Sequence, residues 1–225
     1  MKGDLQEEKF FLDAGSGFGQ YTHFLARKFP EASIFAVDVK EEQIEDCNRF
    51  FHQIKLSERV KFEVADLTQY VEPGKYNLIL SVDVMEHIEE DVKVFRNFYQ
   101  SLSEGGSLLI STPSDQGGSD VHDDHEDSFI DEHVRDGYNI NEIESKLKSA
   151  GFKTIFSKYS YGGPGKISWK LSMKYPISIL NVSKLLFIIL PFYYLLTYPF
   201  CILLNFLDVR FNHKTGTGLI VKAIK

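Results

Sequence analysis

The chain has 225 residues, of which 43% are hydrophobic and 25% charged, both close to the average of globular proteins. This composition excludes a disordered, collagen-like or disulfide-scaffold chain and favours one domain built around a hydrophobic core. The two cysteines, Cys47 and Cys201, form no C-x-x-C pair, so we expect neither a zinc cage nor a disulfide framework. The first ten residues are polar and lack the apolar segment of a secretory signal, which favours a cytoplasmic protein.

The net charge of −7 is unevenly distributed along the chain. Residues 1–165 carry 17 Lys/Arg and 31 Asp/Glu, whereas residues 166–225 carry 8 Lys/Arg and a single acidic residue, Asp208. The acidic first part argues against nucleic acid as a ligand, because phosphate binding requires a basic surface. The basic part is also apolar, since Leu185–Leu207 contains no charge at all. Basic flanks around an uncharged segment indicate an anionic membrane surface as a partner.

Short apolar runs alternate with helical patterns along the first 160 residues, as a mostly parallel α/β sheet requires. We expect strands at Lys9–Ala14, Ser33–Asp38, Val60–Val64, Tyr76–Val82, Ser107–Ser111, Phe152–Tyr161 and Gly218–Ile224. We expect helices at about Gly19–Phe29, Glu41–Leu56, Glu89–Leu102 and Asn141–Ala150. Asn139 is expected to cap the last of these helices and Gly151 to end it. A turn at residues 104–106 is expected to precede the fifth strand.

The segment Asp13-Ala14-Gly15-Ser16-Gly17-Phe18-Gly19 lies between the first strand and the first helix. Glycines at this point let the backbone approach a ligand, with the N–H groups of the helix directed at it. The spacing is G-x-G-x-G, whereas nicotinamide dinucleotide sites use G-x-G-x-x-G, so a pyrophosphate is not indicated. An acidic residue before the glycines suits a cationic part of a ligand better.

Five segments together resemble the class I S-adenosylmethionine-dependent methyltransferases. They are DAGSGFGQYTHFLA from Asp13, VDV from Val37, ADL from Ala65, YNLILSVDVMEHIEE from Tyr76 and GGSLLISTPS from Gly105. The resemblance is to the branch that methylates small molecules and quinone or lipid precursors, and it covers about residues 9–161 and the last strand. It implies a Rossmann-like α/β sheet that is mostly parallel, with the last strand antiparallel.

The resemblance implies S-adenosyl-L-methionine as the cofactor. The glycines would wrap its methionine part and Asp13 would hold its ammonium, while Asp38 would accept the ribose hydroxyls. Asp66 and Leu67 would contact the adenine. The implied cofactor-binding residues are Asp13, Gly15, Ser16, Gly17, Gly19, Asp38, Val39, Asp66, Leu67, Ser81, Val82 and Asp83. The alternatives are a helix N-cap for Asp38 and a turn residue for Asp66.

Methyl transfer to a hydroxyl is helped by a general base, for which the candidates are His87, Asp83, His133 and Tyr138. His87 follows Glu86 where this family often has a similar pair, and it is also placed to cap the following helix. On the substrate side the candidates are His133, Arg135, Tyr138 and Trp169. For the first three of these, capping and salt bridging are the alternative.

The acidic segment Ser119–Tyr138 resembles a metal site at first sight, because His122 and His125 stand among several aspartates. No rigid ligand pattern such as H-E-x-x-H occurs, so we expect a solvated loop and no metal.

The chain departs from the family in two ways: no helices precede the first strand, and an insertion separates the last two strands. We expect residues 1–161 and 216–225 to form the cofactor-binding domain and residues 162–215 to form the insertion. If the last strand returns to its neighbour, both ends of the insertion lie on one side of a membrane, which excludes a single crossing. Pro191 and Pro199 also interrupt the uncharged run. We expect a re-entrant or in-plane helical hairpin with lysines at the headgroups, or alternatively an apolar roof or dimer face.

The sequence thus predicts a monotopic or peripheral enzyme on the cytoplasmic face of a membrane. Its acceptor would be hydrophobic or membrane-borne: an isoprenoid, quinone precursor, polyene or lipid-linked glycan. One alternative is a methyltransferase for a soluble sugar or small metabolite whose insertion forms a dimer face. Another is a catalytically silent module that binds a membrane partner. No oligomeric state is indicated.

Overall fold

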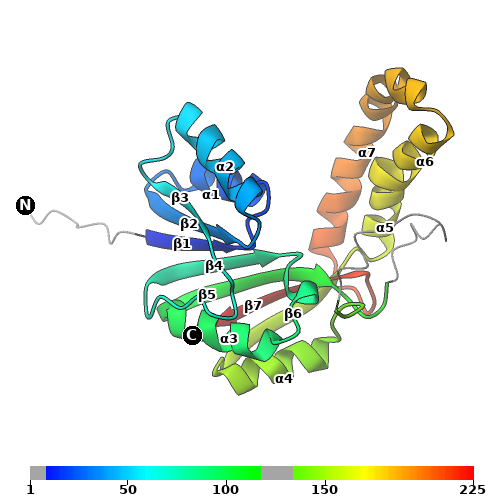
Figure 1. Cartoon of the computed structure of the whole chain (residues 1–225). Coiled ribbons are helices and arrows are strands. Elements are labelled where there is room, and N and C mark those ends of the chain that lie inside the picture. Colours follow the sequence, from blue (N-terminus) through cyan, green and yellow to red (C-terminus); the bar gives the residue numbers. More distant parts are fainter. Residues whose placement is uncertain (1–8, 118–133) are drawn as a thin grey trace, which may run out of the picture.

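A computed structural model describes residues 9–117 and 134–225 of the chain. It contains a seven-stranded sheet in the order β3-β2-β1-β4-β5-β7-β6 (Figure 1). The strands are β1 Lys9–Ala14, β2 Ala32–Asp38, β3 Val60–Val64, β4 Tyr76–Val82, β5 Leu102–Pro113, β6 Thr154–Ser160 and β7 Gly218–Ile224. The first five strands are parallel, and β7 pairs antiparallel with both β5 and β6. The expected α/β fold class is confirmed, including the helical insertion between the last two strands.

Helices cover both faces of the sheet. They are α1 Gln20–Lys28, α2 Glu41–Gln53, the short η1 Met85–His87, α3 Asp91–Ser101 and α4 Ile140–Ala150. The first two lie on one face and α3 and α4 on the other, so that two apolar clusters form (Figure 1). Alternate residues of β1 supply the two clusters, with Phe11 on the α1 side and Leu12 on the α3 side. This alternation follows from the two-residue period of a strand.

The bounds of three strands, β2, β5 and β6, differ from the sequence expectation, and β5 differs most. Strand β5 begins at Leu102 instead of Ser107, because the register against β4 shifts at Tyr76 and Gly105 adopts a positive φ of 75°. Residues 104–106 therefore lie within an irregular strand, where the N–H of Lys225 donates to the Gly106 carbonyl at 3.1 Å. At α4 the expected caps are confirmed: the Asn139 side chain accepts from the N–H of Asn141.

The insertion forms a helical hairpin of two arms that projects from the sheet (Figure 1). The first arm consists of α5 Gly163–Trp169, the π-helical η3 Lys170–Lys174 and α6 Tyr175–Val182. The second arm consists of η4 Lys184–Ile189 and α7 Leu190–Arg210. Among the described residues this second arm, Lys184–Arg210, is long and apolar enough to cross a membrane by length and composition. The expected return of the chain to β7 beside β6 is confirmed, while the placement of the hairpin relative to a membrane stays a prediction.

Asp208 joins the two arms where the hairpin meets the sheet. Its buried carboxylate accepts from the N–H of Tyr161 at 2.8 Å and from the N–H of Gly165 at 2.9 Å, and it pairs with His213 at 3.0 Å. Tyr161 and Gly165 lie at the start of the insertion and His213 lies at its end, so one carboxylate holds both ends of the insertion together.

Farther from the sheet, the hydroxyls of two tyrosines in the second arm bond the first arm. Pro176 has no N–H to bond the carbonyl of Ser172 one turn earlier, and the π-helical turn alters the ladder at the same place. Tyr194 donates its hydroxyl to the Ser172 carbonyl at 3.0 Å, and Tyr193 donates to the Leu171 carbonyl at 2.7 Å. The second arm thereby satisfies backbone acceptors of the first, which fixes the register between them.

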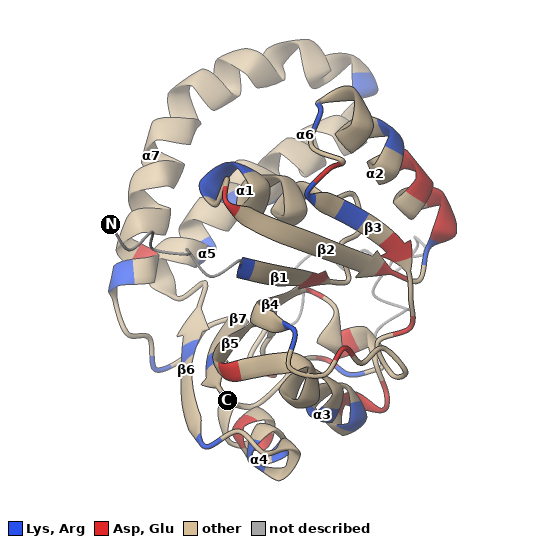
Figure 2. Ribbon diagram, turned by 90° about the vertical axis from the view of Figure 1, so that its left-hand side faces the viewer, with Lys and Arg blue, Asp and Glu red and all other residues tan. Residues whose placement is uncertain are grey.

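The outer surface of the hairpin is apolar. Helix α7 spans about 31 Å at roughly 1.5 Å per residue. Large side chains on it are more than half exposed: Phe192, Leu195, Leu196, Tyr198, Phe200, Ile202, Leu203 and Phe206. Figure 2 shows almost no charge along this helix, in contrast to α2. Helices that are apolar on all sides are typical of segments that are buried in a membrane or in a protein interface.

Candidate active site

The turn after β1 is built for close approach of a ligand. Gly15, Gly17 and Gly19 all have positive φ, at 83°, 49° and 72°. At Gly15 a Cβ would lie 2.3 Å from Cγ2 of Val84, so that side chain already fills the space. Apart from its two chain neighbours, no heavy atom of the described residues lies within 4 Å of the Cβ position of Gly17, where the backbone faces open space. The turn thus combines a tightly packed glycine with an open one, as a backbone cradle for a ligand requires.

Asp13, at the end of β1, is buried and bonded by the hydroxyl of Thr22 in α1. Burial raises its pKa to about 6, an effect that the Thr22 hydrogen bond only partly offsets. A buried carboxyl with a raised pKa is stabilised in its charged form by a cation. This environment fits the role implied for Asp13, which is to hold an ammonium group.

Asp38 and Asp66 follow the next two strands. Asp38 accepts from the N–H of Gly17 at 2.9 Å and from that of Lys40 at 3.0 Å, so it also organises the glycine turn. Asp66 accepts from the N–H of Thr68 at 2.8 Å, which is the turn interaction named as its alternative role. Both carboxylates retain solvent contact and free acceptor capacity for the hydroxyls or amine of a ligand. Leu67 is buried in the core and Val39 is exposed.

Two buried hydroxyl groups lack hydrogen-bond partners within the described part of the chain at this edge of the sheet. They are Oγ of Ser16 in the glycine turn and Oγ of Ser81 near the end of β4. Buried polar groups in proteins are nearly always paired, so orphaned hydroxyls at a glycine cradle indicate a missing polar ligand. Both residues belong to the set implied for S-adenosylmethionine, and the site therefore fits that cofactor.

The segment after β4, which carries Asp83 and His87, packs against the glycine turn through Val84. Asp83 has a left-handed backbone with φ of 53°, and its N–H donates to the Ser111 carbonyl at 2.9 Å. Partial desolvation raises the pKa of the Asp83 carboxyl, and the nearby His87 opposes the rise. Val82 lines the same edge and is half-buried. Asp83 and His87 thus remain together as candidates for a general base.

Sequence reasoning did not assign a role to Glu86, which is almost fully buried next to this pair. Its carboxylate accepts from the hydroxyl of Thr112 at 3.0 Å, and burial raises its pKa. Its backbone carbonyl accepts from the N–H of Val134, which ties the segment after the acidic loop to the edge of the sheet. The sequence offered one signal for Glu86, which is its position directly before the candidate base His87.

The structure gives Arg135 and Tyr138 a structural role. Both bond the buried carboxylate of Asp91 at the start of α3, and Lys146 joins them at 2.7 Å. The Tyr138 hydroxyl also donates to the Met85 carbonyl, and burial together with Asp91 raises its pKa far above the usual range. A phenol held in this way is a poor base, while the catalytic role of Tyr138 and the substrate-side roles of Arg135 and Tyr138 stay predictions. The alternative of salt bridging is the one observed.

The other predicted residues lie elsewhere. His133, His122 and His125 lie outside the described residues. No group of three or more potential metal ligands occurs within residues 9–117 and 134–225, and the expectation of no metal stays a prediction. Trp169 is half-buried at the end of α5, in the hairpin and not in the glycine turn.

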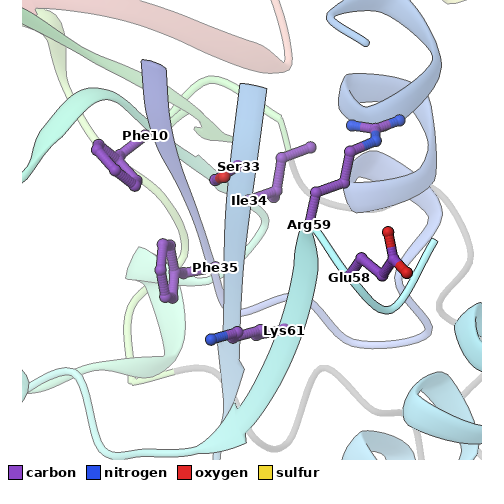
Figure 3. A pocket seen from close by; sticks show the side chains of 7 residues that line it. All are labelled: Phe10, Ser33, Ile34, Phe35, Glu58, Arg59 and Lys61. Carbon is purple, nitrogen blue, oxygen red and sulfur yellow. The ribbon is translucent and has the colours of Figure 1, made fainter. Parts of the chain in front are cut away.

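An open pocket lies at the opposite edge of the sheet, where the strands begin (Figure 3). It is lined by Phe10, Ser33, Ile34, Phe35, Glu58, Arg59 and Lys61. The Arg59 guanidinium donates to backbone carbonyls of Phe29 and Ala32, which is a structural use. In parallel α/β sheets ligands bind at the carboxyl ends of the strands, so this pocket is not the cofactor site.

Comparison with known families gives a match over more than half of the chain. A family model described as a methyltransferase domain matches residues 5–156. The chain is 30% identical over 169 residues to phosphoethanolamine N-methyltransferase 1 of Arabidopsis thaliana, covering 70% of this chain and 31% of that protein. It is also 30% identical over 113 residues to the chloroplastic tocopherol O-methyltransferase of the same plant, covering 48% and 32%. The chain thus spans about a third of the length of these relatives.

Solved structures share the fold. Phosphoethanolamine N-methyltransferase 2 of Haemonchus contortus, in complex with S-adenosyl-L-methionine, superposes with a TM-score of 0.68 at 22% identity. The match covers 99% of this chain and 50% of that one. The [4+2]-cyclase SpnF superposes with a TM-score of 0.64 at 17% identity, covering 98% and 76%. Chains of one fold therefore carry different activities, and the residues of the site, not the fold, determine the chemistry.

Proposed function

Because this chain belongs to the class I S-adenosylmethionine-dependent methyltransferases, we propose that it methylates a hydrophobic or membrane-borne small molecule. An isoprenoid, a quinone precursor, a polyene or a lipid-linked glycan fits this description. One observation carries the proposal: the apolar hairpin leaves the sheet at the same edge as the cofactor cradle. Strand β6 runs parallel to β1 and β4, since β7 is antiparallel to both β5 and β6. The end of β6, where the hairpin begins, therefore lies at the carboxyl edge with the ends of β1 and β4.

The described residues at this edge divide into binding and proton-handling groups. Bound S-adenosylmethionine supplies an electrophilic methyl group on a sulfonium, which is a good leaving group. The glycine turn, Asp13 and Asp38 hold and orient the cofactor, and Ser16 and Ser81 offer hydroxyls that lack other partners. An acceptor hydroxyl loses its proton on methylation, and Asp83, supported by His87, is placed to take it. The enzyme otherwise accelerates the displacement by positioning.

The exterior of the hairpin supports contact with a lipid surface. Its large apolar side chains are exposed, and the chain from residue 166 onward carries a net positive charge. Lys166, Lys170 and Lys174 lie in the first arm, and Lys184 is the first residue of the second arm. Lysines bind anionic headgroups while their aliphatic stems accompany the apolar surface. We infer a monotopic or peripheral enzyme on the cytoplasmic face of a membrane, with the hairpin as its anchor.

A second candidate is a methyltransferase for a soluble sugar or small metabolite in which two hairpins form a dimer face. The exposed apolar strip of α7 favours it, because such a strip is also typical of an obligate protein interface. A third is a catalytically silent module, which the fold shared with a cyclase keeps open. The orphaned Ser16 and Ser81 hydroxyls support cofactor binding and argue against it.

The test is incubation of the purified protein with methyl-labelled S-adenosylmethionine and a host membrane extract. The proposal predicts label in a lipid-soluble product. A matched variant replaces residues 163–212 by a short Gly-Ser turn. It should be soluble and should bind the cofactor, but should label membrane-borne acceptors poorly. Label in a water-soluble product with both proteins supports the second candidate, and no cofactor binding by either overturns the proposal.

A further inference from the structure

Thr22, the third residue of α1, holds the buried carboxylate of Asp13. Its hydroxyl lies 2.5 Å from Oδ2 of Asp13, and its backbone also bonds that carboxylate. Both side chains are almost fully buried, at 1% exposure for Asp13 and 0% for Thr22. The contact joins the end of β1 to the first turn of α1, and the glycine turn lies between the two residues in the chain. One residue of α1 therefore fixes this carboxylate relative to the glycine turn.

Helix α1 begins without a side-chain cap of its own. Its N-cap residue is Gly19, which has a left-handed backbone and no side chain that can accept from the helix. The first N–H groups of a helix have no partner within the helix, so they need acceptors from outside it. The carboxylate of Asp13 supplies one for the backbone of Thr22. Helix capping is therefore an alternative to a role of this contact in ligand binding.

Thr22 also favours the charged form of Asp13. Burial raises the pKa of this carboxyl, and the carboxylate of Asp38 adds to the rise. Among the described residues, the interactions that lower this pKa come from the hydroxyl and the backbone of Thr22. Tyr21 in α1 and Cys47 in α2 are further titratable groups on which the charge of Asp13 acts. All of these titratable neighbours are acids, so a cationic group of a ligand is the kind of partner that this carboxylate would stabilise.

We propose that Thr22 is a positioning residue of the cofactor site, whose hydroxyl holds the Asp13 carboxylate in the orientation in which it receives the ammonium group of S-adenosylmethionine. A carboxylate accepts about four hydrogen bonds, so the bonds from Thr22 leave acceptor capacity for that group. The Ser16 hydroxyl, which lacks a partner within the described part of the chain, belongs to the turn between Asp13 and Thr22 and supports a polar ligand there. The inference rests on the proposed function, since it concerns the cofactor of that reaction.

Two ligands that differ in their amino-acid part test the inference. S-adenosylhomocysteine carries the ammonium group, whereas 5′-methylthioadenosine has the same nucleoside and lacks the amino-acid part. Each is titrated calorimetrically into the full chain at several pH values, as wild type, Thr22→Val and Thr22→Ser.

We expect Thr22→Val to bind S-adenosylhomocysteine about tenfold more weakly near pH 6, because a hydrogen bond to the charged carboxylate is lost and Asp13 binds its proton more tightly. The loss should become smaller toward about pH 8, where Asp13 is ionised in both proteins. The affinity for 5′-methylthioadenosine should stay as in the wild type throughout. Thr22→Ser, which keeps the hydroxyl, should restore both the affinity for S-adenosylhomocysteine and its pH profile.

Urea unfolding without ligand gives a second measurement. Thr22→Val raises the folded-state pKa of Asp13 further above its unfolded value, so its loss of stability should be small below about pH 4 and should grow toward about pH 7. Ser101→Ala is the control, because it removes another buried hydroxyl, which accepts from the N–H of Glu72 at 3.0 Å. It should lower stability by the same amount at each pH and leave both ligand affinities unchanged.

Helix capping alone predicts a different pattern. If Thr22→Val weakens both ligands by the same factor at every pH, or if Thr22→Ser does not restore binding, Thr22 is not a positioning residue. A loss of stability in Thr22→Val that is constant with pH would likewise contradict the contact with ionised Asp13. These outcomes overturn the inference alone. If the wild type binds neither ligand, the proposed function fails and the inference fails with it.

Discussion

The Oδ1 atom of Asp208 lies 2.9 Å from the backbone nitrogen of Gly165, across 43 positions of the chain. A Cβ at residue 165 would lie 2.7 Å from the carboxylate carbon, so glycine is what allows this approach. The single acidic residue of the basic C-terminal part is therefore buried at the root of the hairpin, where it bonds the N–H of the first arm and of Tyr161.

Asp208→Asn should loosen the hairpin root. Hydrogen bonds to a charged acceptor contribute about 1.5–3 kcal/mol, and the amide of asparagine would direct N–H groups at other N–H groups. We expect faster tryptic cleavage at Lys166 and Lys170, with unchanged affinity for S-adenosylmethionine. Asn205→Ala, an exposed position of the same helix, is the control and should behave like the wild type. Equal cleavage rates in all three proteins would show that Asp208 does not hold the root.

Gly15→Ala should destabilise the fold more than an ordinary glycine substitution. The new Cβ would lie 2.3 Å from Cγ2 of Val84, and the positive φ adds strain. We expect a loss of about 3 kcal/mol in urea unfolding, the sum of overpacking and left-handed strain. Gly74→Ala is the matched control, since its φ is 67° and its Cβ would meet no atom of the described residues within 4 Å, its chain neighbours apart. It should cost about 1–2 kcal/mol.

The double variant Gly15→Ala, Val84→Ala separates the two causes. Removing the Val84 methyl groups relieves the contact but not the backbone strain, so part of the loss should be recovered. If the double variant loses as much stability as Gly15→Ala and Val84→Ala added together, the whole effect of Gly15→Ala belongs to the backbone.

Asp38→Ala should weaken cofactor binding. The carboxylate offers its remaining acceptor capacity to a ligand and also bonds the N–H of Gly17. We expect a loss on the order of 2 kcal/mol, or about thirtyfold in affinity, measured by calorimetry. Asp46→Ala on α2 removes an equally charged but exposed carboxylate and should have no effect. Unchanged affinity in Asp38→Ala would remove this residue from the cofactor site, and tighter binding of NAD would contradict the family's cofactor.

The raised pKa of Asp13 predicts that the stability of the folded protein depends on pH. Its pKa is about 6 in the folded protein against 3.8 for the free side chain, so the folded state binds the proton more tightly. Ionising this buried carboxyl in the folded state lowers the free energy of unfolding. The effect is absent below about pH 4, develops between pH 4 and pH 6 and is complete above pH 6, where it reaches about 3 kcal/mol. The stability of the wild type relative to Asp13→Asn should therefore fall across this interval. Saturating S-adenosylmethionine should reduce the fall, because its ammonium stabilises the carboxylate.

A difference between wild type and Asp13→Asn that stays constant from pH 4 to 7 would contradict this account of Asp13. Chemical denaturation at each pH supplies the measurement.

The hairpin should bind anionic vesicles by two separable contributions. Lysines near the surface contribute about 1 kcal/mol each and weaken with salt, whereas burial of apolar side chains does not. Salt should release the protein incompletely and detergent fully. Leu196→Glu and Leu203→Glu, at exposed positions of α7, should each weaken binding by about 2 kcal/mol or more. Ile54→Glu, an exposed position after α2, is the control.

Protease protection in sealed vesicles tests the topology of the hairpin. Because β7 returns beside β6, Lys174 and Lys214 should be cleaved from the same side. Cleavage from opposite sides would mean that the insertion spans the membrane.

Strand positions were predictable because their signal is local. Most of the parallel strands read as apolar runs, β3 alternates between buried and exposed residues, and β1, β3, β4 and β7 begin and end at the expected residues. Strand β5 was cut short because Gly105 and Gly106 indicate a turn, whereas here a register shift keeps them in the sheet. The glycine turn was found for the same local reason, since its chemistry lies in consecutive residues.

Residues that act over long sequence separations were not found. Asp208 bonds backbone groups more than forty residues away, and nothing near it in the sequence marks that role. Tyr138 was predicted as a substrate-side residue from the family resemblance, whereas its hydrogen bond to Asp91, which comes from another helix, was not predictable from the sequence. Tyr161 gives no sequence signal at all, because its left-handed backbone is imposed by the hairpin root.

The pairing of Ser160 with Gly218 brings the two ends of the insertion together as neighbours in adjacent strands. A chain that lacked the whole hairpin could close this gap with a tight turn, and the sheet order would not change. A single insertion or deletion between Ser160 and Gly218 could therefore add or remove the whole hairpin. The same segment could be placed in another enzyme of this fold by joining it to the corresponding ends of two adjacent strands. Such an event would leave the strands that carry the cofactor site unchanged, because β1, β2 and β4 lie outside the insertion.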